Sequence, residues 1–120
     1  MTVRRLKTYT GSQGYVYQYY FVGQRPAAIM PSEDLATEYI FDVTSDRKTT
    51  YAVSVLLPQQ VVSAWNEVHG RSLKDSEQYA AAKLRLFRAF DELQAIPTTG
   101  CCLQVDLHSL EESLSTLGVE

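Results

Sequence analysis

Lys83 is the residue whose chemistry depends most on its surroundings. At 100° per residue it falls near the middle of an apolar helical face made of Tyr79, Ala82, Leu86, Phe87, Phe90 and Leu93. A lysine that loses its water there has a lowered pKa, which suits a general base or a Schiff-base nucleophile. Two other interpretations stay open. The ammonium group can reach solvent at a nearby edge, which is usual for such lysines, or it can pair with a buried carboxylate such as Asp42.

The eight tyrosines form a second candidate for chemistry. Tyr15, Tyr17 and Tyr19 alternate along one segment, so a strand places them on one face. An exposed row of rings could stack nucleobases or another flat ligand. The candidate ligand-binding residues are then Tyr15, Tyr17, Tyr19, Arg25 and Lys83. The alternative, which we favour, is aromatic packing between strands beneath helices.

A third group consists of side chains that can bind metals, namely Cys101, Cys102, Asp106, His108 and His69. Their spacing matches no zinc finger or ribbon, and cysteines more often behave as small apolar residues. We therefore predict no metal and no cofactor. No segment carries a nucleotide motif, the catalytic residues stay unknown, and we lean towards a protein that is not an enzyme.

The elements that must position these residues follow from periodicity. Alternating apolar and polar residues predict strands over 3–9, 15–22, 38–44 and 50–57. The short polar segments 10–14 and 45–49 predict reversals, so the strands form an antiparallel meander of three or four members. Segment 23–37 lacks a clear period and contains Pro26 and Pro31, which predicts a long loop of the kind that acts as a lid, binds a ligand or is disordered.

Helical spacing follows the strands. A helix is predicted from Pro58 to Gly70, and a longer one over 75–93 with Asp75 as its cap and a polar, solvent-facing stripe that includes Arg85 and Arg88. A last strand over 101–107 precedes a helix capped by Ser109. The sequence thus predicts an α+β fold with strands first, then two helices, a strand and a C-terminal helix.

Composition limits the class of protein. A chain of 120 residues with 45% hydrophobic residues predicts a single domain over 1–120. The formal net charge of −3 disfavours nucleic acid as a partner without excluding it. No apolar run is long enough to span a membrane, so we expect no membrane partner. The two adjacent cysteines offer no disulfide framework, so we expect a cytoplasmic protein.

Two features predict a homo-oligomer. Leu107, Leu110, Leu114 and Leu117 form a narrow helical seam, which fits either contact with a second copy, the interpretation that we favour, or docking on the same chain. The second face of the predicted sheet, with Val16, Tyr20, Ile40, Ala52 and Leu56, is partly apolar, as expected where a partner subunit covers it. We therefore expect a non-catalytic binding or interaction module that self-associates. The alternatives are a binder of nucleic acid or flat aromatic ligands that uses the tyrosine sheet, and a small enzyme that uses Lys83 or the Cys/His group.

Overall fold

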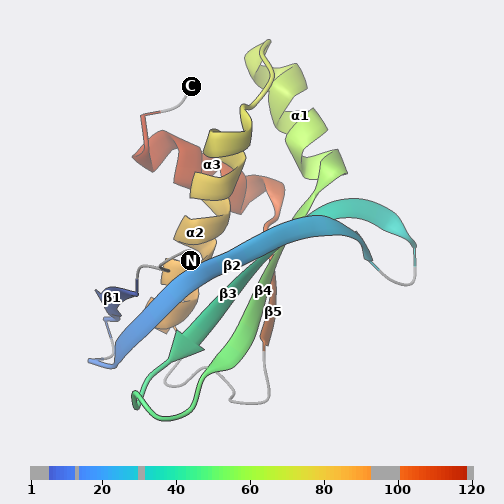
Figure 1. The fold of residues 1–120 in the computed structure, drawn as a ribbon. Helices are drawn as coiled ribbons and strands as arrows, with labels where there is room; N and C mark the ends of the chain where they lie inside the picture. Colours follow the sequence, from blue (N-terminus) through green and yellow to red (C-terminus); the bar gives the residue numbers. More distant parts are fainter. Residues whose placement is uncertain (1–5, 13, 30–31, 93–100, 119–120) are drawn as a thin grey trace.

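The computed structural model describes residues 6–12, 14–29, 32–92 and 101–118, and it confirms the predicted α+β fold (Figure 1). Its elements are β1 (Lys7–Thr10), β2 (Val16–Ile29), β3 (Asp34–Thr44), β4 (Tyr51–Pro58), α1 (Gln59–His69), α2 (Asp75–Glu92), β5 (Cys101–Gln104) and α3 (Leu107–Thr116). The five strands form one sheet in the order β1-β2-β3-β4-β5. Residues 3–5 of the first predicted strand lie outside the described residues.

The first four strands are antiparallel, whereas β5 is parallel to β4. Parallel neighbours need a crossover connection, and here the crossover contains α1 and α2. Val53 pairs with Cys101 and Leu56 with Gln104, so the last strand extends the sheet beyond β4. Figure 1 shows the three helices gathered on one side of this sheet.

Residues 23–29 and 34–37 are strand rather than loop, so the prediction of a loop was wrong there. β2 continues to Ile29 and pairs with β3 as far as Asp34. The register shifts between Phe21 and Gly23, and such a bulge breaks the alternation from which a strand is recognised in sequence. Pro26 is tolerated because, among the described residues, β1 pairs with residues 16–19 of β2 and leaves the outer part of β2 as an edge.

The core lies between the helices and one face of the sheet. Tyr17, Phe41 and Val55 are fully buried on this face, and Trp65 and Phe90 are fully buried on the helices. Alternation along β2, β3 and β4 therefore predicted the buried face correctly, since successive strand residues point to opposite sides. Within the described ranges, no helix combines the length and the apolar composition needed to cross a bilayer.

The first turn of α2 is closed by a different residue from the predicted cap. The carbonyl oxygen of Lys74 accepts the backbone N–H of Gln78, and Glu77 accepts the N–H of Lys74 at 2.8 Å. Arg71 adds a two-pronged contact to Glu77, with N···O distances of 3.1 and 2.8 Å. The cap position that we had given to Asp75 is therefore taken by Lys74, whose backbone N–H is satisfied by the Glu77 side chain.

Glu77 supplies a pH prediction. The hydrogen bonds from Arg71 and then from the Lys74 backbone lower the pKa of Glu77 to about 2. A lowered pKa means that the carboxylate's contribution to stability is complete above its unfolded pKa of about 4.3, and is lost as pH falls towards 2. We expect Arg71→Gln to raise the titration midpoint of the Glu77 carboxyl carbon measured by NMR. Arg85→Gln is the control, and an unchanged midpoint in Arg71→Gln would contradict the assignment.

Helix α3 begins at Leu107, because Asp106 rather than Ser109 is its N-cap. The Asp106 carboxylate accepts the backbone N–H of Ser109 at 2.7 Å. Leu110 and Leu114 are fully buried in the core of the same chain, against which α3 packs. The centre of the leucine seam therefore faces its own chain, and the seam does not supply the subunit contact that we predicted from it.

Candidate functional site

Two of the three candidate tyrosines are covered by α2. The ring of Tyr17 stacks on Phe90 with centroids 4.2 Å apart, and the ring of Tyr19 meets Phe87 edge-on at 5.5 Å. Tyr17 is 0% exposed and Tyr19 is 4% exposed, whereas Tyr15 is 43% exposed. The favoured interpretation, packing beneath the helices, is confirmed, and these two buried rings offer no stacking surface to a ligand.

The other two candidate residues lie apart from each other. Arg25 is on the outer part of β2, where its Nε donates to Glu38 Oε1 at 2.7 Å. Lys83 is on α2, and its Nζ lies 6.0 Å from the centroid of the Tyr19 ring. The five predicted residues are therefore not brought together, since the sheet places Arg25 on its helix-free side and the Tyr19 ring on its helix-covered side.

Lys83 is half-buried among aromatic rings. Its Nζ also lies 5.8 Å from the centroid of the Phe87 ring. Burial lowers the pKa of Lys83, and the nearby ammonium group of Lys7 lowers it further. Asp42, the carboxylate that we considered as a partner, instead accepts the Tyr20 hydroxyl at 2.6 Å on the opposite side of the sheet. The ion pair with Asp42 is therefore not formed.

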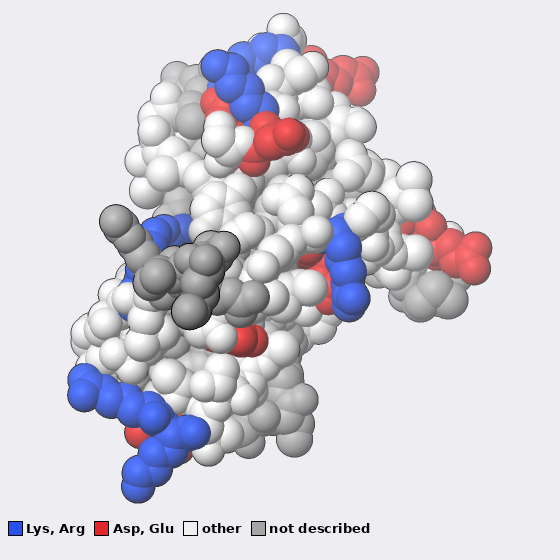
Figure 2. All heavy atoms as spheres, in the orientation of Figure 1, with Lys and Arg blue, Asp and Glu red and all other residues white. Residues whose placement is uncertain are grey.

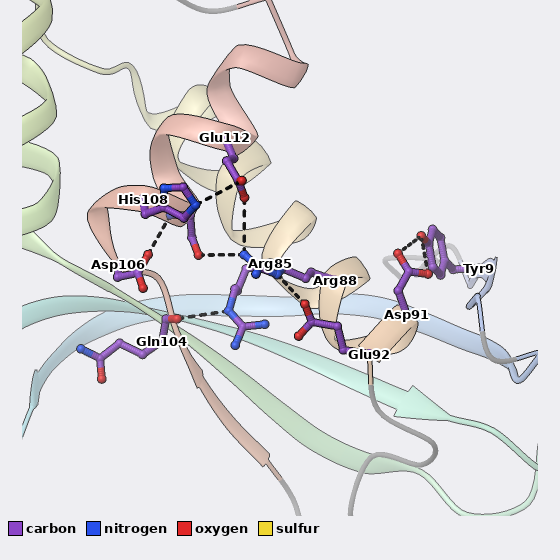
Figure 3. Close-up of polar contacts among 10 residues, drawn as sticks. Tyr9, Arg85, Arg88, Asp91, Glu92, Gln104, Asp106, His108 and Glu112 are labelled. Atoms are coloured by element: carbon purple, nitrogen blue, oxygen red, sulfur yellow. Dashed lines mark hydrogen bonds and ion pairs between the residues drawn. The ribbon is translucent and has the colours of Figure 1, made fainter.

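A polar groove, which we call the α2–α3 groove, runs between these two helices beside the end of β5 (Figure 3). Arg88 donates to Glu92 at 2.7 Å and to the buried Ser109 hydroxyl at 3.3 Å, and it lies 3.6 Å from Glu112. Arg85 donates to the backbone carbonyl of Gln104 at 3.1 Å. Arg88 remains exposed, in agreement with the predicted solvent-facing stripe, but helical spacing alone did not reveal that α3 packs beside it.

The α2–α3 groove contains basic and acidic side chains that contact one another. Two hollows of about 240 and 160 Å³ lie along it, and arginines and carboxylates line both. The Arg88 guanidinium faces Glu92 and Glu112, and His108 lies 3.2 Å from Glu112. The contacts of Arg88 with Ser109 and Glu112 join α2 to α3, so the charged side chains of the groove stabilise the packing of these two helices.

A second set of polar contacts, which the sequence did not reveal, joins β1 and the β1–β2 turn to the C-terminal end of α2. The Tyr9 hydroxyl donates to both oxygens of Asp91, at 3.1 and 3.0 Å (Figure 3). The backbone N–H of Ser12 donates to the same carboxylate at 3.0 Å. Tyr9 also stacks on Phe87 with centroids 4.4 Å apart. The partners are far apart in sequence, so no local pattern could have identified them.

The histidines and Cys102 have separate neighbours. His69 stacks on Trp65 at 4.1 Å and contacts both oxygens of Glu111 at 3.0 Å, which joins α1 to α3. Burial raises the pKa of the Cys102 thiol, and the negative charge of Glu38 raises it further. In the part of the chain that the structure describes, no group of three or more His, Cys, Asp or Glu side chains could hold a metal ion.

The remaining candidate is the sheet face that no described helix covers, which we call the open face. Its residues are Val16, Gln18, Tyr20, Arg25, Glu38, Ile40, Asp42, Ala52, Ser54, Leu56 and Cys102. Val16 is 46% exposed, and Ile40 and Leu56 are half-buried. The second-face residues that we listed from the sequence all lie here.

The polar side chains of the open face are largely paired with one another. Tyr20 donates to Asp42 at 2.6 Å, Ser54 donates to Glu38 at 2.6 Å, and Arg25 holds the second oxygen of Glu38. Arg25 and then Ser54 hold the pKa of Glu38 below its usual range. On the surface drawn in Figure 2, basic and acidic side chains are scattered among uncharged ones. That pattern differs from the clustered basic stripe typical of a nucleic-acid interface.

Comparisons of the chain with protein-family models, with curated proteins and with solved structures found no match.

Proposed function

We propose that this protein is a non-catalytic interaction module that forms a homodimer through its open face. The observation that carries the proposal is the one-sided sheet, whose helices all lie on one face while Ile40, Leu56 and Val16 remain on the other. Two twisted sheets can pack face to face when the facing side chains interlock. A second copy of the chain supplies such a sheet.

The pairing of polar groups on the open face supports this proposal. A polar group that already has a hydrogen-bond partner costs less to remove from water than one without. The Glu38 carboxylate is neutralised by Arg25 and also accepts a hydrogen bond from Ser54. The Tyr20–Asp42 pair likewise provides its own hydrogen bond. Around them, apolar side chains supply the gain in free energy from burial.

Two further observations support the class of function and its location. The charged side chains of the α2–α3 groove contact one another and hold the helices together, which is a structural task. Cys102 is a free, exposed thiol. Exposed thiols persist in a reducing compartment, so we propose that the homodimer works in the cytoplasm.

A charge on the open face is expected to separate the subunits. Ile40→Glu places a carboxylate in the proposed interface, where it would lose water without gaining a partner. We expect the unchanged protein to sediment at twice the 13.5 kDa mass of the chain at micromolar concentration, and Ile40→Glu to sediment as a monomer. Sedimentation equilibrium measures both masses, and circular dichroism checks that the variant is folded.

The matched control is Val68→Glu, which makes the same kind of change at a residue on α1 that is 72% exposed. Its mass should equal that of the unchanged protein. A mass of 13.5 kDa for the unchanged protein at every concentration would overturn the proposal. A dimer that Ile40→Glu leaves intact would show that subunits meet elsewhere.

A further inference from the structure

Two lysines meet above the aromatic layer on the helix-covered side of the sheet. Lys7 of β1 is paired directly with Tyr19 of β2, so its side chain rises from the same face as the Tyr19 ring. Lys83 approaches that ring from α2, with Nζ 6.0 Å from its centroid. Lys7 and Lys83 are therefore neighbours beside the same Tyr19 ring, one on β1 and the other on α2. Among the described residues, neither lysine forms an ion pair.

The surroundings of Lys83 distinguish it from the other lysines. The chain contains four lysines, Lys7, Lys48, Lys74 and Lys83. Lys48 and Lys74 are exposed, whereas Lys83 is half-buried between the Tyr19 and Phe87 rings. Partial loss of water and a neighbouring positive charge both favour the neutral amine, which is the nucleophilic form. The lowered pKa of Lys83 agrees with this geometry.

We propose that Lys83 is a site for reversible imine formation with small aldehydes that carry an anionic group, and that Lys7 binds that group. An aldehyde at Lys83 has the apolar Phe87 ring beside it, since Nζ lies 5.8 Å from the centroid of this half-buried ring. An anionic substituent gains attraction from Lys7, which has no carboxylate partner within the described ranges. The site is independent of the open face, because it lies on the other side of the sheet.

The reaction needs only the aldehyde. The lone pair of the Lys83 amine attacks the carbonyl carbon, a C–N bond forms, and the π electrons of the C=O bond move to oxygen. One proton passes from nitrogen to that oxygen, which gives a carbinolamine. Loss of the hydroxyl group with a proton releases water and leaves the C=N bond. Hydrolysis reverses each step, so borohydride reduction is needed to make the product permanent.

Pyridoxal 5′-phosphate is a suitable probe because it combines an aldehyde with a phosphate, and pyridoxal is the matched aldehyde without the phosphate. Each is added to the full chain at neutral pH, trapped with borohydride, and located by peptide mass spectrometry. We expect Lys83 to carry several-fold more phosphorylated adduct than Lys48 or Lys74. We also expect the ratio of phosphorylated to unphosphorylated adduct to be higher at Lys83 than at Lys74.

Lys7→Met tests the role of the second amine. In this variant the ratio at Lys83 should fall to the ratio measured at Lys74, because the phosphate has lost its partner. Lys48→Met is the control and should leave labelling at Lys83 unchanged. Equal labelling of Lys48, Lys74 and Lys83 in the unchanged protein would overturn the site. A ratio at Lys83 that survives Lys7→Met would overturn the assignment of Lys7.

Discussion

Tyr17→Ala is expected to lower the free energy of unfolding by about 3–5 kcal/mol, the usual range for removing a large aromatic side chain from a core. Tyr17 is fully buried, and its ring stacks on Phe90 at 4.2 Å with an angle of 8° between the planes. The substitution removes this contact and leaves a cavity between the sheet and α2. Denaturation in urea, followed by circular dichroism, measures the change.

Tyr15→Ala is the matched control, since Tyr15 is two residues away and 43% exposed. It should change stability by much less, because 43% of Tyr15 is already exposed to water and substitutions at exposed sites usually have small effects. The two variants compare a covered and an uncovered tyrosine of the same segment. Equal losses of stability in both would show that α2 does not cover this face as the structure has it.

Gly11→Ala is expected to have the second large effect. Gly11 is buried in the β1–β2 turn, where its N–H donates to the carbonyl of Tyr15 at 2.9 Å. A Cβ at this position would overlap the backbone carbonyl oxygen of Phe90. A backbone atom cannot move away by a change of side-chain rotamer, so the overlap must be relieved by a shift of the turn or of α2. We expect a loss of about 1–3 kcal/mol, as for other overpacked sites, together with weaker docking of the turn on α2.

The docking of the β1–β2 turn on α2 can be measured separately from the free energy of unfolding. Asp91 accepts the Ser12 N–H at 3.0 Å, so displacement of the turn should increase hydrogen exchange at Ser12. Gly23→Ala is the control, because a Cβ there would meet nothing within 4 Å. If Gly11→Ala is as stable as the unchanged protein and Ser12 keeps its protection from hydrogen exchange, the turn does not approach α2 as closely as the structure has it.

The candidate site was only partly predictable. Alternation identified the open face and the buried tyrosine face, because the side-chain period of a strand is a local property. Helical spacing identified Lys83 as a lysine beside aromatic rings, and Phe87 is indeed one of its neighbours. Lys7 was not identified as its other neighbour, because the contact depends on the pairing of β1 with β2.

The sequence by itself determined where the strands over 16–22, 38–44 and 51–57 and the three helices lie, and which of their faces are apolar. Only the tertiary structure decided that β5 lies parallel to β4, that β2 and β3 continue as a hairpin past the bulge at Phe21, and that α3 docks on its own chain. The physical reason is that periodicity depends on neighbours along the chain, whereas these arrangements depend on contacts between distant segments. The bulge hides a strand from pattern recognition, and a buried leucine has the same spacing whether its partner is the same chain or another.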